Sequence, residues 1–433
     1  MKLGRPEAVW EKKLRTVLLI VFVVSLPVSV ALQQTALGLL LALLAYSSWR
    51  NMQIPFSPLD WPLLVFFVTL LLSSLLSPSP LSSLFALRKL WLIGTFFTVY
   101  HLVQEPCEAW QLVRLMLIVT AGVAVYGIVQ HFTGIDVDKQ LLGKASDVIP
   151  LWLGNQGGFR TEGFFPTGIT YAHNLCFPLI LLTTRLSAPD LRWREGLLLG
   201  AGWGLMVFAL LFSLTRGVWL AYLVVLGVLG LVKGGKGLVV VGGCTVFLAL
   251  VLLNAGSWVH SRMNEVFNFA VNQNRHQIWQ ANIDMIKERP LFGWGYGNYK
   301  QFREPYYARY PAADTHAHAH NNFLQVWVDS GLVGLLAFLF LLWRILGSGW
   351  QAYHSLPVEE EPLRSLTLGG TLSLVGFLLG GLTQYNFGDA EVVIVFWTMT
   401  GILMRVSEWT REESQRISTP EVRLAAVAAS KDH

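Results

Sequence analysis

The chain has 433 residues, of which 53% are hydrophobic and only 14% are charged. Its 17 Trp and 25 Phe residues exceed what a water-soluble globular domain of this size contains. The composition therefore excludes an ordinary soluble enzyme and indicates an integral membrane protein. The formal net charge of +5 does not indicate a nucleic-acid partner, because most of the basic residues gather in loops and tails on one side of the predicted spans.

Apolar windows long enough to cross a bilayer as helices recur along the chain, which predicts an all-α polytopic membrane protein. The first window resembles the apolar part of a signal peptide, but the many windows behind it favour an uncleaved anchor. We expect about twelve spans, at 15–32, 35–49, 61–77, 83–104, 110–131, 168–186, 196–213, 217–232, 237–254, 320–346, 364–384 and 388–406.

This pattern predicts four parts along the chain. Residues 1–254 carry nine spans and an outer loop at 132–167, and residues 255–319 form a large outer loop. Residues 320–406 carry three further spans, and residues 407–433 form a tail. An even number of spans places both termini on one side, where Lys and Arg concentrate, so the positive-inside rule predicts that both termini are cytoplasmic.

One arginine stands between two predicted spans, in the segment LLFSLTRGVWLAYLVVL. Arg216 has almost no polar neighbours in the sequence, and an ionised side chain within a membrane costs at least about 2.5 kcal/mol when it reaches neither water nor a partner. It either extends to the outer head groups or serves a function. We favour a function, because ionisable residues within membranes usually belong to sites.

The two long outer loops carry further cations. Arg160 lies beside Glu162 in the glycine-rich segment GNQGGFRTEGFFPTG, where a local ion pair in a flexible turn is an equally good interpretation. In NRHQIWQANIDMIKERP, apolar residues recur at helical spacing and Pro290 ends the run, which predicts an amphipathic helix on the membrane interface that begins at Arg275. In the next segment, PLFGWGYGNY, three alternating glycines predict a turn with exposed backbone N–H groups.

Three histidines alternate in THAHAHNN, at positions 316, 318 and 320. An extended chain would place all three on one side as for zinc, but the sequence offers few further ligands nearby. A structural interpretation is that Asn321 or Asn322 caps the next helix while the histidines face water. A catalytic interpretation is that a neutral imidazole takes a proton from a hydroxyl at neutral pH. We rank the metal third and expect no cofactor.

The candidates thus combine one base with several fixed cations at the outer membrane boundary. Arginine forks bind phosphate oxygens at two points and stay charged, so they can hold a pyrophosphate and stabilise it as it leaves. This combination suits transfer from a phosphorylated lipid to a hydroxyl group. Such a site needs no divalent metal, and the sequence contains no H-E-x-x-H pattern.

Three segments, RGVWLAYLVVL, RHQIWQANIDMIKERPLFGWGYGNY and HAHNNFLQVWVDSGLVGLL, resemble in this order the O-antigen ligase and polymerase superfamily of bacterial envelope glycosyltransferases. The likeness covers roughly residues 155–345 and rests elsewhere on helix count. RTEGFFPTGITYAHNL resembles the family's Arg-x-x-Gly-x-Phe segment, although Pro166, Thr167 and Gly168 stand where the family has Asn-Pro-Asn. The resemblance implies a GT-C-like glycosyltransferase of the inner membrane with a periplasmic active site.

The resemblance also implies roles for single residues. The His before Asn in the third segment is the family's essential base, here His320, and His318 matches the preceding family His. Arg216 and Arg275 match arginines that hold the lipid-linked pyrophosphate, and Arg160 matches another. By position only, the further candidates for substrate binding are Arg262, Arg88, Lys89, Asn321 and Asp389, the last of which would orient His320 or an acceptor hydroxyl, or cap the twelfth helix.

The implied reaction is an inverting, metal-independent glycan transfer with His320 as general base. Its donor is a polysaccharide on undecaprenyl pyrophosphate, and its acceptor is a sugar hydroxyl of lipid A-core. A polymerase of the same superfamily, a protein O-oligosaccharyltransferase and a lipid or solute transporter stay open as alternatives. We rank transport last, because transporters place such groups near the bilayer midplane, whereas here they gather at one face.

Overall fold

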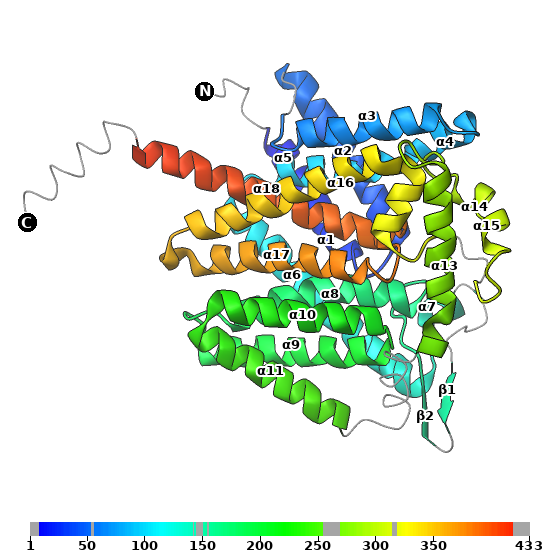
Figure 1. Cartoon of the computed structure of the whole chain (residues 1–433). Coiled ribbons are helices and arrows are strands. Elements are labelled where there is room, and N and C mark those ends of the chain that lie inside the picture. Colours follow the sequence, from blue (N-terminus) through cyan, green and yellow to red (C-terminus); the bar gives the residue numbers. More distant parts are fainter. Residues whose placement is uncertain are drawn as a thin grey trace, which may run out of the picture.

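The structure is a computed structural model that describes residues 8–52, 56–141, 143, 150–153, 156–253, 269–313 and 318–418. Most long helices run side by side as one bundle, and α13 (Phe269–Glu288) crosses one end of it (Figure 1). The long helices of the bundle are α1 (Val9–Ser25), α2 (Val30–Asn51), α3 (Asp60–Leu75), α6 (Pro106–Thr133), α8 (Gly168–Leu186), α9 (Trp193–Phe212), α10 (Arg216–Lys233), α11 (Gly235–Leu253), α16 (Asn322–Ser355), α17 (Glu361–Gly380) and α18 (Ala390–Ser418).

Short elements connect these helices. They are α4 (Pro80–Ala86), η1 (Leu87–Ile93), α5 (Gly94–Leu102), α7 (Val137–Leu141), α14 (Tyr299–Phe302), α15 (Glu304–Tyr307), η2 (Val358–Glu360) and η3 (Asn386–Gly388). The expected all-α class has one local exception, because β1 (Pro150–Leu153) and β2 (Gln156–Phe159) form an antiparallel hairpin in which Leu151 faces Gly158. The hairpin lies at the same end of the bundle as α13 (Figure 1).

Seven helices in the described part of the chain are long and apolar enough to cross a membrane. They are α2, α6, α9, α10, α16, α17 and α18, and α3 and α11 contain shorter apolar helices. The multi-pass class is therefore confirmed, while the number of twelve spans stays a prediction. The helix α18 continues to Ser418, past the predicted end of the last span at residue 406.

The predicted fourth span at 83–104 is not one helix. It is divided into α4, the 3-10 helix η1 and α5. In this segment Arg88 stacks on the ring of Phe85 at 3.8 Å, and the Ser83 hydroxyl donates to the backbone oxygen of Tyr296 at 3.0 Å. The Ser83 bond ties the segment to the chain beyond α13, which a continuous apolar window did not predict.

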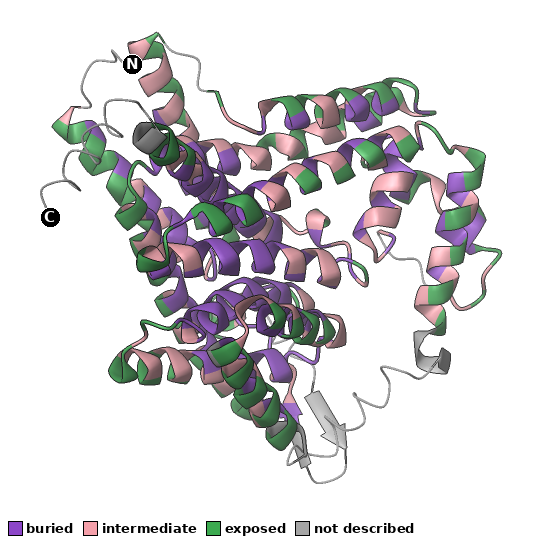
Figure 2. Cartoon of the chain, turned by 60° about the vertical axis from the view of Figure 1, so that its left-hand side comes forward, coloured by how far each residue is buried: buried purple, intermediate pink, exposed green. Residues whose placement is uncertain are grey.

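The centre of the bundle is formed by α8 and α17, where buried residues concentrate (Figure 2). Two glycines of α17 let the helices approach closely. A Cβ atom at Gly376 would lie 2.7 Å from Cδ1 of Ile180, and one at Gly369 would lie 3.1 Å from Cδ2 of Leu181. Small residues at such positions are the usual basis of close helix packing in membranes. This packing holds α8 against α17, and the first turn of α8 carries part of the site described below.

The glycine-rich segment after α13 fits into a break in α16. Gly331 interrupts that helix with φ 67°, and a Cβ there would lie 2.1 Å from the Leu291 oxygen. The N–H groups of Trp294 and Gly295 donate to the oxygens of Val328 and Asp329 at 2.8 and 2.9 Å. The expected exposure of these N–H groups was therefore wrong, because the broken helix supplies their acceptors.

The apolar side of α13 is used in a second core. Ile278, Met285 and Ile286 are buried there together with Trp294 and Tyr306, whereas Ile283, which has the same helical spacing, is 44% exposed. The helix predicted for this segment is α13, but it begins at Phe269, so the expected start at Arg275 was wrong. Its apolar side packs mainly on protein, and this packing fixes α13, and with it Arg275, relative to α16.

Candidate active site

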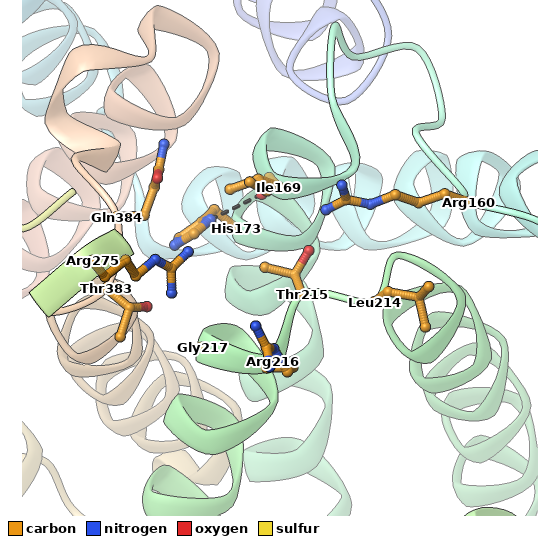
Figure 3. A pocket seen from close by; sticks show the side chains of 10 residues that line it. All are labelled: Arg160, Ile169, His173, Leu214, Thr215, Arg216, Gly217, Arg275, Thr383 and Gln384. Carbon is orange, nitrogen blue, oxygen red and sulfur yellow. Dashed lines mark hydrogen bonds between the residues drawn. The ribbon is translucent and has the colours of Figure 1, made fainter. Parts of the chain in front are cut away.

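A cavity of about 180 Å³ lies where α8, α10, α13 and the turn after α17 meet. Figure 3 shows the guanidinium groups of Arg160 and Arg275 pointing into it from opposite sides, with Arg216 between the two below them. Three arginines that were candidates on sequence grounds thus meet in one place. The lining residues are Arg160, Ile169, His173, Leu214, Thr215, Arg216, Gly217, Arg275, Thr383 and Gln384, and none of these is acidic.

Two helices begin at this cavity. Ile169 lies in the first turn of α8, and Arg216 and Gly217 are the first residues of α10. The N-terminus of a helix carries partial positive charge and orphan N–H groups, and it therefore attracts anions. The N-termini of α8 and α10 therefore add to the positive charge of the arginines, and the cavity favours an anionic group.

The turn between α9 and α10 holds Arg160 and Arg216 together. The Nε atom of Arg160 donates to the backbone oxygen of Ser213 at 2.9 Å, and the Thr215 hydroxyl donates to the Gly168 oxygen at 3.2 Å. A Cβ atom at Gly168 would lie 2.8 Å from Nε of Arg160. Gly168, which stands at the departure from the family's Asn-Pro-Asn, therefore makes room for the Arg160 side chain.

Arg275 comes from α13, at the end of the bundle. Burial, and then the positive charge of Arg216, lower the pKa of Arg275. An arginine stays charged under such conditions, so the lowered pKa reports that two cations are held near each other away from water. Two cations held close together are unfavourable, and an anion bound between the two guanidinium groups would relieve their repulsion.

His320 adjoins this cavity through Gln384. The Nδ1 atom of His320 lies 2.8 Å from Oε1 of Gln384, and Gln384 lines the cavity. Because an amide oxygen only accepts, Nδ1 donates and the neutral ring presents its lone pair at Nε2. Gln384 therefore sets the tautomer that a general base requires.

The backbone around His320 is held by a second glutamine. The Ala319 N–H donates to Oε1 of Gln325 at 2.8 Å, and Nε2 of Gln325 donates to the Asp329 carboxylate at 3.0 Å. His320 itself has φ 49°, a left-handed conformation that a residue other than glycine adopts only under constraint. Its N–H donates to Nδ1 of His318 at 3.3 Å, so His318 supports the loop.

The two asparagines after His320 have structural tasks. Asn321 caps α16, because its Oδ1 accepts from the N–H groups of Phe323 and Leu324 at 2.9 and 3.0 Å. Asn322 is fully buried, and its Nδ2 donates to Oδ1 of Asn386 at 2.6 Å. The capping prediction is confirmed for Asn321. Asn322 fixes the turn that carries Gln384.

The other candidates lie elsewhere. Asp389 contacts Thr170, and burial followed by the charge of Glu391 raises its pKa to about 7. The group bonded to Nδ1 of His320 is Gln384 rather than Asp389. Arg88 and Lys89 belong to η1 and do not line the cavity.

Two expected residues, Arg262 and His316, lie outside the described residues. Within the described part of the chain, no three His, Cys, Asp or Glu side chains are grouped so as to hold a metal ion.

Glu162 pairs with a lysine of the same outer loop. Its Oε2 lies 3.4 Å from Nζ of Lys139, which also contacts Asp136 at 3.1 Å. Burial raises the pKa of Glu162. This cluster anchors the loop just after Arg160, whose Nε atom donates to Ser213 rather than to Glu162.

Sequence reasoning missed two residues of the cavity, His173 and Gln384. His173 lies in an apolar window, and Gln384 lies in the short turn between the last two predicted spans. An ionisable side chain in an apolar window is a signal that could have singled out His173, whereas nothing in its sequence neighbourhood marks Gln384. Only the contact of α8 with the turn after α17 brings them together with the arginines.

Comparison with known proteins finds matches to the part of the chain that contains several of these residues. Residues 201–339 match the model of a family described as O-antigen ligase. An uncharacterized protein of Haemophilus influenzae is 29% identical over 146 residues, which cover 29% of this chain and 37% of that protein. A Rickettsia conorii protein with the name "Putative polysaccharide ligase" is 24% identical over 134 residues, which cover 30% of this chain and 29% of that protein.

The matched family region contains Arg216, Arg275 and His320 but not Arg160 or Gln384. The aligned parts span well under half of either relative. The resemblance to the O-antigen ligase family that the three sequence segments predict is therefore confirmed for residues 201–339.

Proposed function

We propose that this protein is an O-antigen ligase that transfers a polysaccharide from undecaprenyl pyrophosphate to a sugar hydroxyl of lipid A-core on the periplasmic face of the inner membrane. The observation that carries the proposal is the meeting of Arg160, Arg216 and Arg275 in one cavity. Gln384 lines the same cavity and holds His320. The cavity that holds the three arginines therefore lies next to His320.

The arginines are the pyrophosphate clamp. A glycan-linked pyrophosphate diester carries two negative charges, and three guanidinium groups with two helix N-termini exceed that charge. The excess matters after the transfer, because the leaving undecaprenyl pyrophosphate gains a further negative charge on its terminal phosphate. Groups placed where charge develops stabilise the transition state more than the ground state.

His320 is the general base. Its Nε2 atom takes the proton of the acceptor hydroxyl while the hydroxyl oxygen attacks the anomeric carbon of the donor. The bond between that carbon and the phosphate oxygen breaks, the electron pair leaves with the pyrophosphate, and the anomeric configuration inverts. A base of this kind contributes about 10²- to 10⁴-fold to the rate. The metal that some transferases need for a leaving phosphate has a counterpart here in the three arginines.

The identities of donor and acceptor rest on the family resemblance and on the relative with a ligase name. The test is deletion of the gene in the source bacterium, followed by gel separation of its envelope glycolipids. A ligase predicts lipid A-core without polymer together with accumulated lipid-linked polymer. Core capped by single repeats would identify a polymerase instead, and unchanged glycolipids with unglycosylated envelope proteins would identify a protein glycosyltransferase.

Complementation separates the site from the fold. Variants His320→Ala and Arg216→Ala should leave the deletion phenotype in place at normal membrane levels of the protein. The matched control is His354→Ala, because His354 is an exposed histidine near the far end of α16 and should restore the polymer fully. Accumulated lipid-linked polymer on the cytoplasmic side only would point to transport of the lipid and contradict the proposal.

A further inference from the structure

A buried histidine of α8 lines the cavity and is not used by the mechanism above. His173 is 3% exposed and lies one turn into the helix (Figure 3). Its Nδ1 atom lies 2.9 Å from the backbone oxygen of Ile169. Because a carbonyl oxygen only accepts, Nδ1 carries the hydrogen, and Nε2 of the neutral ring presents a lone pair.

The Nε2 atom of His173 makes no hydrogen bond of normal geometry among the described residues, although the backbone of Gly380 interacts with the ring on that side. The ring is confined on that side by Gly380, where a Cβ atom would lie 2.9 Å from Nε2. A buried acceptor without a partner is uncommon in folded proteins and calls for a ligand or water. The position of this atom, at the wall of a cavity, indicates a ligand.

The surroundings keep this imidazole neutral. Burial of the ring, which is 3% exposed, opposes a charge on His173, and Arg275, Arg216 and Arg160 line the same cavity. A further positive charge among these cations is opposed by Coulomb repulsion. Two negative charges on a bound pyrophosphate diester still leave the three arginines in excess, so Nε2 stays an acceptor when the site is filled.

An acceptor differs in kind from the charged groups of the cavity. The guanidinium groups and the N–H groups at the helix starts only donate. A pyrophosphate diester has no hydrogen to donate at neutral pH, so it cannot be the partner of Nε2. The part of the donor that lies next to the pyrophosphate and carries hydroxyl or amide N–H groups is its first sugar.

We propose that Nε2 of His173 accepts a hydrogen bond from a hydroxyl or amide N–H group of the sugar attached to the pyrophosphate, and that His173 thereby selects the donor. This inference rests on the proposed function and adds to it a residue for sugar recognition. Its partner is a saccharide whose first unit offers a donor group beside the phosphates.

The test compares His173→Phe with His173→Gln in the purified full-length protein. The Phe side chain fills the space without an acceptor, whereas the Gln side chain can place its Oε1 where Nε2 lies. Two quantities are measured: KM and kcat for the lipid-linked glycan, and the rise in unfolding temperature on adding inorganic pyrophosphate. We expect His173→Phe to raise KM about fivefold to hundredfold, the range of one lost buried hydrogen bond. His173→Gln should stay within about threefold of the wild type.

The pyrophosphate arm identifies which part of the donor is contacted. Inorganic pyrophosphate has no sugar, so its stabilisation of the protein should be the same in the wild type and in His173→Phe, which also shows that the variant is folded. Loss of this stabilisation in His173→Phe would overturn the inference, because His173 would then contact the phosphates. A lowered kcat with an unchanged KM would also overturn it.

Failure of the proposed function looks different in the same experiment. A wild-type protein that transfers no glycan and gains no stability from pyrophosphate would contradict the clamp itself. A wild type that does both, with equal KM in all three proteins, would leave the clamp standing and overturn only the role of His173.

Discussion

The Oε1 atom of Gln384 lies 2.8 Å from Nδ1 of His320, across 64 positions of the sequence. The contact joins the loop before α16 to the turn after α17, and Asn322 braces it through Asn386. It determines which nitrogen of His320 is free of hydrogen in the neutral ring. The placement of His320, the proposed base, therefore depends on two segments that are remote in the chain.

Substitution of Gln384 should affect the rate more than binding. In Gln384→Ala the ring loses the acceptor for its Nδ1 hydrogen, and we expect kcat to fall about tenfold to hundredfold, part of the range for general-base catalysis. In Gln384→Glu a carboxylate would favour the protonated ring, which raises the pKa of His320. The acidic limb of the rate profile should then move to higher pH. The measurement is the pH dependence of transfer by the purified variants. An unmoved limb in Gln384→Glu would show that Gln384 does not act through His320.

We expect the Arg275 side chain to lower the unfolding temperature of the protein when no anion is bound. Burial and the charge of Arg216 lower its pKa, so the charged side chain is held at an unfavourable place. We expect Arg275→Gln to raise the unfolding temperature without ligand and to lose most of the stabilisation by pyrophosphate, a trade-off common in functional sites. Thermal unfolding with and without pyrophosphate measures both. The control is Arg309→Gln, since the Arg309 side chain is 58% exposed and should change neither. A lower unfolding temperature of empty Arg275→Gln would contradict this account.

The packing of α8 on α17 gives a prediction for stability. A Cβ atom at Gly376 would lie 2.7 Å from Cδ1 of Ile180, so Gly376→Leu forces the helices apart. Overpacking of this kind costs about 1 to 3 kcal/mol. Gly204→Leu on α9 is the control, because nothing lies within 4 Å of a Cβ atom there. The unfolding temperature in detergent should fall for Gly376→Leu only, and equal values for the two variants would refute the close contact.

The raised pKa of Asp389 predicts that the stability of the protein depends on pH. Its pKa is raised to about 7 by burial and by Glu391, whereas a carboxylate in an unfolded chain has a pKa of about 3.9. Between these values the folded protein binds more protons than the unfolded chain, so the contribution of Asp389 to stability is lost as the pH rises through about 7. Asp389→Asn keeps a neutral side chain at every pH. Unfolding temperatures from pH 4 to pH 8 should therefore decline more in the wild type than in Asp389→Asn, and parallel curves would contradict the raised pKa.

Local patterns predicted the helices well where one signal dominated. The run from Arg275 to Pro290 has helical periodicity and a terminator, and it lies in α13, which ends at Glu288 but begins earlier than predicted, at Phe269. Asn321 has the chemistry of a cap and is one. The window at 83–104 is divided into three helical pieces, and Ser83 at its start is bonded to the backbone oxygen of Tyr296. Apolar content alone carries no sign of such contacts.

The site was predictable only in part. Arg216 could be found because a lone charge in an apolar stretch is costly, and the structure brings it together with Arg160 and Arg275. The sequence offers Asp389 as a group that would orient His320 or an acceptor hydroxyl, or cap the twelfth helix. The actual partner is an amide, Gln384. Only the tertiary contact between the turn after α17 and the loop before α16 brings Gln384 to His320, and a single sequence does not reveal this contact.

The central claim is that the three arginines and His320 belong to one transfer site. The most direct measurement is glycan transfer by the purified protein from a lipid-pyrophosphate donor to lipid A-core, with His320→Ala and Arg216→Ala beside the wild type and His354→Ala. We expect the first two variants to bring transfer to background while both stay folded. Only Arg216→Ala should lose the stabilisation by pyrophosphate, and His354→Ala should transfer normally. Transfer at the wild-type rate by folded His320→Ala would contradict it.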